Sequence, residues 1–174
     1  MKCVFLDRDG VINKLVERPN GERTAPWSFE EFELLPNVKE SIDKIHKMGY
    51  SIIVVTNQPD VNDGKLSLED LRKMNAVIYS MGVLNIHSSM GRNTPEYKPN
   101  NAHVELYITL YRIDKIKSFM IGDRWKDIVC GHRSGLTTIF LGETYTTSAE
   151  FSDIKPTMIA RDIKEAVDLI ERII

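Results

Sequence analysis

Short runs of apolar residues recur along the chain, and segments with helical periodicity separate them. Four runs are continuous: Cys3-Val4-Phe5-Leu6, Ile52-Ile53-Val54-Val55, Phe119-Met120-Ile121 and Thr138-Ile139-Phe140-Leu141. Two weaker strand candidates are Leu84-Asn85-Ile86-His87 and Thr157-Met158-Ile159-Ala160. A strand that is apolar at every position is buried on both faces, as in a parallel sheet covered by helices.

Helical spacing of apolar residues predicts five helices between these strands. The expected ranges are about 38–48, 68–81, 99–112, 125–134 and 162–173. Asn37 is the expected N-cap of the first helix, and Ser67 with Asp70 forms a capping motif at the second. The alternation predicts an α/β fold: a three-layer, doubly wound sandwich with a mainly parallel sheet, forming one domain over residues 1–174.

Length, charge and cysteine content narrow the class of protein. A chain of 174 residues fits one domain, and its net charge of −2 offers no basic surface for nucleic acid or a membrane. Cys3 and Cys130 lie in predicted buried elements, so we expect them to be unbridged in a reduced, cytoplasmic setting. The first apolar run is too short for a signal peptide or a membrane span. A monomer is the expected oligomeric state.

Two carboxylates directly follow the first predicted strand. In open α/β sheets, ligands bind beyond the carboxyl ends of the strands, and Asp7 and Asp9 lie at such an end. Paired acids repel each other unless a cation offsets them, and Mg²⁺ prefers oxygen ligands of this kind. One carboxylate could then act as a nucleophile and the other as an acid and base. The simpler alternative is a solvated Asp-Gly turn at Asp9-Gly10.

Polar residues also follow the second strand and precede the third helix. Thr56-Asn57-Gln58 offers a hydroxyl and two amides that can bind phosphate oxygens, although a polar loop start is the alternative. Lys98-Pro99 is predicted to begin a helix, with Pro99 at the first helical position. Positive charge beside a helix N-terminus suits an anion, whereas the alternative is an ordinary surface lysine.

A third group of candidates follows Phe119-Met120-Ile121. Asp123 lies at the strand end and Asp127 lies one turn into the next helix, so both could face one metal ion. The alternative for Asp123 is a helix N-cap. Together these segments place Asp, Asp, Thr, Lys and Asp at successive element ends on one edge of the sheet.

This set of motifs resembles the haloacid-dehalogenase (HAD) superfamily of phosphohydrolases. The four matching motifs are Asp7-Arg8-Asp9-Gly10, Thr56-Asn57, Lys98 and Gly122-Asp123-Arg124-Trp125-Lys126-Asp127. The sequence around them is most similar to the branch of heptose 1,7-bisphosphate and histidinol-phosphate phosphatases. The resemblance spans roughly residues 2–142. It implies a HAD-like, Rossmannoid fold, and the chain is too short for the large inserted cap domain of other members.

The resemblance implies a role for each motif residue. It implies that Asp7 is the nucleophile and that Asp9 protonates the leaving oxygen and then activates water. It implies that Thr56, Asn57 and Lys98 bind the phosphoryl group. The implied Mg²⁺ ligands are Asp7, the backbone carbonyl of Asp9, and Asp123. Asp127 is expected to orient these residues without contacting the metal ion. The implied activity is magnesium-dependent hydrolysis of a small phosphorylated metabolite through an aspartyl-phosphate, with a sugar phosphate favoured over histidinol phosphate.

The chain departs from the branch in the loop over residues 87–97. Relatives carry a cysteine and histidine zinc loop there, but this segment has one histidine and no cysteine, so no structural zinc is expected. Tyr97 occupies the position, directly before Lys98, at which the branch tends to have an arginine that contacts the substrate. We therefore expect a weaker preference for a bisphosphate. Gln58, Arg92, Tyr97 and Arg23 are the candidate substrate contacts, within specificity loops at 14–36, 59–66 and 87–97.

Two non-enzymatic classes share parts of this pattern. A receiver-type signalling domain is also doubly wound, but its phosphate-accepting aspartate would end a middle strand, and the second strand here ends at Thr56-Asn57. A stable phospho-switch also has no use for the acid and base that the Asp7-x-Asp9 pair supplies. A catalytically idle binding protein would not need the whole set. Turnover of p-nitrophenyl phosphate with Mg²⁺ separates the phosphatase from both.

Overall fold

A sheet of six parallel strands forms the centre of the computed structural model, which describes residues 1–174. In spatial order the strands are β5 (Asn85–Ser89), β4 (Ser51–Asn57), β1 (Cys3–Leu6), β6 (Phe119–Gly122), β7 (Thr137–Leu141) and β8 (Met158–Ala160). Every neighbouring pair is parallel. The predicted strands are therefore confirmed, including the two weaker candidates, and β5 continues to Ser89.

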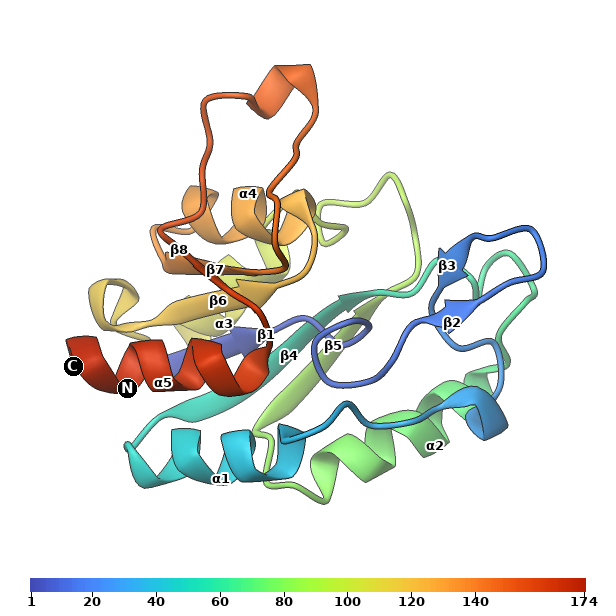
Figure 1. Cartoon of the computed structure of the whole chain (residues 1–174), viewed down its shortest axis with the longest axis horizontal. Coiled ribbons are helices and arrows are strands. Elements are labelled where there is room, and N and C mark those ends of the chain that lie inside the picture. The colour runs from blue at the N-terminus through green and yellow to red at the C-terminus, as the bar shows by residue number, and fades with distance from the viewer.

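Helices cover both faces of this sheet, as Figure 1 shows. They are α1 (Val38–Lys47), α2 (Leu68–Tyr79), α3 (Ala102–Tyr111), α4 (Trp125–Arg133) and α5 (Ile163–Ile173), with short 3₁₀ helices η2 (Lys115–Lys117) and η3 (Ala149–Phe151) in connections. Val4 and Leu6 of β1 pack in one core with α1 and α5, whereas Cys3 and Phe5 pack in another with α3. Because strand side chains alternate between faces, one apolar strand supplies both cores. This confirms the three-layer sandwich, and no large cap domain is present.

The chain order through the sheet determines where a ligand can bind. The central strand β1 lies between β4 and β6, and the chain adds β4 and β5 on one side before it returns to add β6, β7 and β8 on the other. In doubly wound sheets, the crevice beyond the strand ends opens where the order reverses in this way. The ends of β1, β4 and β6 flank that crevice.

An excursion between β1 and α1 contains structure that the sequence did not predict. It carries a small antiparallel hairpin, β2 (Val16–Glu17) and β3 (Arg23–Thr24), and a 3₁₀ helix, η1 (Phe29–Glu31). Its two ends meet, because Lys14 N donates to Glu33 O at 2.8 Å and Leu35 N donates to Ile12 O at 2.9 Å. In Figure 1 the hairpin extends away from the sheet, beside the ends of β4 and β5.

Local signals for helix ends were partly wrong. Ser67 caps α2 as predicted, since its Oγ accepts from Asp70 N at 3.0 Å. Asn37 instead adopts a left-handed conformation with φ of 62° and makes no side-chain cap. The third helix begins at Ala102 and not at Pro99, and the Lys98-Pro99 peptide is cis. The N-cap of α4 is Arg124, so Asp123 is free of that role.

Two further expectations can be compared with the structure. Cys3 and Cys130 are buried free thiols, as predicted. None of the helices has the length and apolar character that crossing a membrane requires.

Candidate active site

A cleft of about 770 Å³ lies at the carboxyl ends of the central strands. Every residue that the sequence suggested for catalysis, phosphate binding, metal binding or support lines this cleft: Asp7, Asp9, Thr56, Asn57, Lys98, Asp123 and Asp127. They come from three strand ends, one helix and the loop before α3. The parallel topology therefore gathers residues that lie more than a hundred positions apart in the chain.

Lys98 is buried at the centre of this set. Its Nζ donates to Asp7 Oδ1 at 2.8 Å, to Asp127 Oδ1 at 2.6 Å and to Val55 O at 2.7 Å. These three acceptors use all of its donors. Burial alone would lower the pKa of Lys98, but Asp127 and Asp7 together raise that pKa above its ordinary value. The lysine is therefore a fixed positive charge beside Asp7.

The backbone of Lys98 is held as firmly as its side chain. Asn57 Oδ1 accepts from Lys98 N at 3.0 Å, and Asn57 Nδ2 donates to Lys98 O at 3.0 Å. Asn57 thus fixes the segment that carries the lysine, a role that the sequence did not suggest. This two-point contact also explains why the chain around Pro99 is a loop. The peptide groups of residue 98 pair with β4 and cannot enter a helix.

Asp9 accepts hydrogen bonds from three directions. Its Oδ2 accepts from Gln58 Nε2 at 2.6 Å, and its Oδ1 accepts from Asn13 Nδ2 at 3.0 Å and from Arg8 Nη2 at 3.1 Å. Gln58 also donates to Thr56 Oγ1 at 2.9 Å. Gln58 is fully buried, so it orients Asp9 and Thr56 and does not face the cleft.

Arg8 and Asn13 are functional neighbours that the sequence analysis missed. Both are fully buried against Asp9. Arginine is rarely buried unless it is paired, and a charged residue in an expected turn gave no sign of complete burial. The available signal was the position of Arg8 between Asp7 and Asp9, which makes a local ion pair possible.

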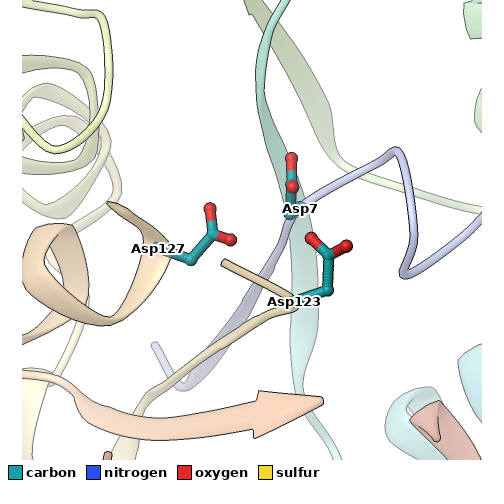
Figure 2. Close-up of side chains that lie close together, drawn as sticks. All are labelled: Asp7, Asp123 and Asp127. Carbon is teal, nitrogen blue, oxygen red and sulfur yellow. The ribbon is translucent and has the colours of Figure 1, made fainter. Parts of the chain in front are cut away.

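Asp7, Asp123 and Asp127 form a cluster whose carboxylate oxygens lie within 4.8 Å of one another. Figure 2 shows Asp7 at its strand end, with Asp123 and Asp127 beside it. Burial, followed by mutual repulsion within the cluster, raises the pKa of Asp7 to about 6 and that of Asp123 to about 8. Oδ1 of Asp123 is buried without a hydrogen-bond partner.

This donor set fits a hard divalent cation. Carboxylate oxygens are the ligands that Mg²⁺ prefers, and a cation would remove both the repulsion and the missing partner. Both oxygens of Asp127 are already engaged, by Lys98 Nζ and by Arg124 N at 3.0 Å. Asp7 and Asp123 are therefore better placed as ligands, and Asp127 supports Lys98.

Gly10 allows Asp123 to approach this turn. It has a φ of +87°, and a β-carbon there would overlap with the Asp123 carboxylate. Glycine is the residue that adopts such a conformation without strain. The glycine after Asp9 is thus required by both the backbone and the packing.

The candidate substrate contacts have different positions. Arg92 and Tyr97 line the cleft, but Arg92 is bound by both oxygens of Asp63, at 2.7 and 2.5 Å. Arg23 is exposed and lines a neighbouring pocket. The expected specificity loops at 14–36 and 59–66 also contribute to the cleft wall, through Leu15, Glu22, Thr24, Ala25 and Lys65. Wall residues outside those loops are Trp125, Lys126, Phe140 and Thr146.

Arg18 holds the hairpin that supplies Glu22 and Thr24. Its guanidinium binds Glu31 through Nη1–Oε1 at 2.7 Å and Nη2–Oε2 at 2.9 Å. It also lies 3.6 Å from the Trp27 ring centroid and donates from Nε to Thr24 Oγ1 at 2.8 Å. Arg18 therefore fixes one wall of the cleft.

Comparison with known proteins identifies relatives over nearly the whole chain. D-glycero-D-manno-heptose-1,7-bisphosphate 7-phosphatase of Chlorobaculum tepidum is 30% identical, covering 95% of this chain and 92% of the relative. D-glycero-beta-D-manno-heptose-1,7-bisphosphate 7-phosphatase of Helicobacter pylori is 26% identical over 98% of each chain. Residues 97–166 match the HAD-hydrolase-like family model.

Solved structures agree on the fold. D,D-heptose 1.7-bisphosphate phosphatase from B. bronchiseptica, crystallised with magnesium and phosphate, superposes with a TM-score of 0.81 over 99% of both chains, at 19% identity. The chain therefore belongs to the haloacid-dehalogenase superfamily and is a hydrolase of phosphate esters.

Proposed function

We propose that this protein is a magnesium-dependent phosphatase of a small sugar phosphate and that it acts through a phosphoryl group transferred to Asp7. The observation that carries the proposal is the convergence of the Asp7 carboxylate, the buried Lys98 ammonium and the Asp9 carboxylate in one cleft. The heptose-bisphosphate phosphatases among the relatives support a sugar phosphate as the substrate class.

Asp7 and Asp9 divide the chemistry between them. An oxygen of Asp7 bonds to phosphorus while the ester oxygen leaves, and Asp9 gives that oxygen a proton. Asp9 then takes a proton from water, whose oxygen bonds to phosphorus and breaks the bond to Asp7. The product is inorganic phosphate, and both carboxyl groups return to their starting states. Gln58, Asn13 and Arg8 hold Asp9 in position for both transfers.

The surrounding residues position the phosphoryl group and neutralise its charge, as phosphoryl transfer requires. Lys98 places its positive charge beside the phosphoryl oxygens, Thr56 offers them its hydroxyl, and Asn57 keeps Lys98 in place. Asp7, Asp123 and the backbone carbonyl of Asp9 would hold Mg²⁺, which when bound neutralises charge on the phosphoryl oxygens.

Turnover measurements test the proposal. Purified protein should release phosphate from several sugar phosphates and from p-nitrophenyl phosphate. EDTA should stop the reaction, and Mg²⁺ should restore it. Full activity in EDTA would reject the metal assignment. Absence of turnover with any ester would favour a receiver-like or binding protein, and clear selectivity for histidinol phosphate would reject a sugar substrate.

Substitution of the nucleophile is a sharper test. Asp7→Asn should reduce turnover below detection, because a neutral amide does not form the acyl-phosphate. The same substitution outside the cleft, Asp168→Asn on α5, serves as the control and should keep its activity. Beryllium fluoride should form its adduct on Asp7 in the wild-type protein, and near-normal rates in Asp7→Asn would overturn the mechanism.

The remaining predictions from the sequence belong to the same proposal. They are a single catalytic domain over residues 1–174, a zinc-free loop over residues 87–97, a monomer, a cytoplasmic location, and no nucleic-acid or membrane partner. Elemental analysis and light scattering on the purified protein test the zinc and the oligomeric state.

A further inference from the structure

The connection between β7 and β8, residues 142–157, borders the cleft although it lies outside the specificity loops that the sequence suggested. In Figure 1 this β7–β8 segment rises from the sheet over α4. Its base is closed, because Gly142 N donates to Ala160 O at 2.9 Å and Thr157 N donates to Thr138 Oγ1 at 3.1 Å. The segment therefore leaves the framework and returns to it at fixed points.

The β7–β8 segment reaches the cleft in three places. Thr146 lines the cleft itself. Tyr145 packs edge-on against Phe140, another residue of the wall, with ring centroids 5.2 Å apart. Phe151 of η3 stacks on Trp125, with ring centroids 5.4 Å apart and planes inclined by 27°. Two of the three contacts thus act through an aromatic ring that belongs to the cleft wall.

Trp125 is the wall residue nearest in sequence to the catalytic groups. It is the first residue of α4, is half-buried and lines the cleft. It lies two positions from Asp123, a metal ligand in the proposed mechanism, and two from Asp127, which binds Lys98. Because all of these residues line one cleft, the leaving group of a bound ester has the indole within its reach.

Phe151 fixes the indole from outside the cleft. It is not one of the lining residues, and Arg133 covers it, with the guanidinium carbon 5.0 Å from the ring centroid. Arg133 also donates from Nη1 to Pro99 O at 3.2 Å, which joins this stack to the loop that carries Lys98. Stacked rings favour a small set of relative orientations. Trp125 is therefore an ordered aromatic surface and not a freely rotating side chain.

An aromatic surface suits the uncharged carbon framework of a ligand. The electron-rich face of the indole attracts C–H groups, and contact between the two surfaces removes apolar area from water. Tyr97 borders the same part of the cleft, because Lys126 Nζ lies 5.4 Å from its ring centroid and 5.8 Å from that of Trp125. The charged groups around Asp7 engage the phosphoryl group, so the aromatic wall is available to the leaving group.

Resting on the proposed function, we propose that Trp125 is a specificity-determining residue whose indole packs against the ring of the substrate, and that Phe151 is the positioning residue that holds it there. The β7–β8 segment is then a further specificity element of the enzyme. Esters of cyclic sugars should be preferred to short open-chain esters, because only a ring covers the indole. The preference concerns the shape of the leaving group and not its charge.

The test compares two alkyl esters with the same reacting group. Initial rates are measured with glucose 6-phosphate and glycerol 3-phosphate, which are both monophosphates of a primary alcohol. Trp125→Ala should raise KM for the glucose ester about 10- to 30-fold, as expected for the loss of one aromatic contact. KM for the glycerol ester should change less than about threefold. The kcat values should stay close to wild type, because this contact is equal in the ground and transition states.

Matched variants separate the positioning role of Phe151 from a loss of folding. Phe151→Ala should raise KM for the glucose ester about 3- to 10-fold and leave that for the glycerol ester nearly unchanged. Phe151→Tyr keeps the stacked ring and should restore the wild-type ratio. Tyr79→Ala removes an exposed ring on α2, outside the cleft, and should leave both KM values unchanged. An unchanged ratio in Phe151→Ala would remove the β7–β8 segment from substrate selection.

Tryptophan fluorescence provides a readout that does not depend on turnover. The chain has two tryptophans, so Trp125 is the only one in the variant Asp7→Asn/Trp27→Phe, which should bind esters without hydrolysing them. Glucose 6-phosphate should change its emission, and glycerol 3-phosphate and inorganic phosphate should change it less.

Three outcomes would overturn the role of Trp125. They are a wild type that hydrolyses the two esters equally well, equal losses on both esters in Trp125→Ala, and an emission that responds equally to glucose 6-phosphate and to inorganic phosphate. If the wild type hydrolyses no ester, the proposed function fails separately. The fluorescence titration then decides, and an emission that does not respond to the glucose ester rejects the contact with Trp125.

Discussion

At the scale of single residues, the surroundings of Asp9 differ from those of Asp7. Asp7 faces an ammonium and two other carboxylates, whereas Asp9 is surrounded by donors from Gln58, Asn13 and Arg8. Amide and guanidinium donors fix the orientation of a carboxyl group. Two similar residues, two positions apart, are thus prepared for attack and for proton transfer respectively.

The variant Asp9→Asn tests this division. It keeps the size of the side chain, but its amide has one accepting oxygen in place of two and does not exchange protons at catalytic rates. We expect kcat on a sugar phosphate to fall by roughly two to four orders of magnitude, the usual effect of one positioned acid or base. The loss with p-nitrophenyl phosphate should be smaller, because its leaving group needs less protonation.

Circular dichroism on Asp9→Asn serves as the control for folding. Losses of equal size on the two esters would contradict the role of Asp9 as the acid. Retention of wild-type kcat on both would remove it from the reaction altogether.

At the scale of elements, the hairpin is the part of the cleft that depends on a few side chains. Val16–Glu17 and Arg23–Thr24 form a two-stranded sheet, which is marginal by itself. Arg18 adds a bidentate ion pair with Glu31 and a stacking contact with Trp27. The side chain of Glu31 is 32% exposed, so solvent screening reduces the value of this pair.

We expect Arg18→Ala to lower the free energy of unfolding by about 1–2 kcal/mol through lost hydrogen bonds and stacking. Trypsin should also cleave faster after Arg23, because the hairpin opens more often. Urea unfolding and timed proteolysis measure the two effects. Arg18→Lys should be intermediate, since it keeps the charge and loses the planar fork. An unchanged cleavage rate in Arg18→Ala would contradict this role.

The elements also show what the sequence could and could not predict. The strands were predictable because burial on both faces leaves a continuous apolar run, as in Cys3–Leu6. The site was predictable because parallel strands bring their ends to one edge. The helix start at Pro99 was wrong, because a long-range contact from Asn57 overrides the local preference of proline.

The hairpin was missed for a similar reason. Its stability comes from contacts of Arg18 with Trp27 and Glu31, which are polar or distant in sequence and produce no apolar alternation. Lys126 was overlooked because a lysine on a helix is usually a solvated residue. In the structure it lines the cleft beside Tyr97.

At the scale of the whole molecule, one buried histidine connects stability to pH. His103 of α3 is 1% exposed and stacks on His87 of β5, with ring centroids 5.1 Å apart. Burial, together with the nearby charges of Lys98 and His87, lowers the pKa of His103 to about 3. Its Nδ1 has no hydrogen-bond partner, which fits a neutral ring.

This shift gives a direction for acid unfolding. An unfolded histidine has a pKa of about 6.5, so between pH 6.5 and 3 the unfolded chain binds more protons than the folded one. The contribution of His103 is therefore complete above pH 6.5 and is lost as the pH falls towards 3. We expect the stability difference between wild type and His103→Gln to decrease by roughly 2 kcal/mol from pH 7.5 to pH 5.

Urea unfolding at the two pH values measures this difference, and carboxylate effects cancel because both proteins share them. The exposed His132→Gln variant controls for the general loss of an imidazole. A difference between wild type and His103→Gln that does not change with pH would show that His103 is protonated in the fold or is irrelevant to stability.

The meeting of the two ends of the hairpin excursion has a consequence for protein engineering. Lys14 and Glu33 are joined by backbone and side-chain contacts, so residues 15–32 leave the framework and return to nearly the same point. Changing the length of a closed excursion costs little, because loop entropy grows only with the logarithm of length. The strand ends that carry Asp7, Thr56 and Asp123 lie outside it. Residues 15–27 are therefore an exchangeable cassette, in which libraries of other lengths and sequences can retarget the cleft, while Phe29 and Phe32 keep their contacts with the core.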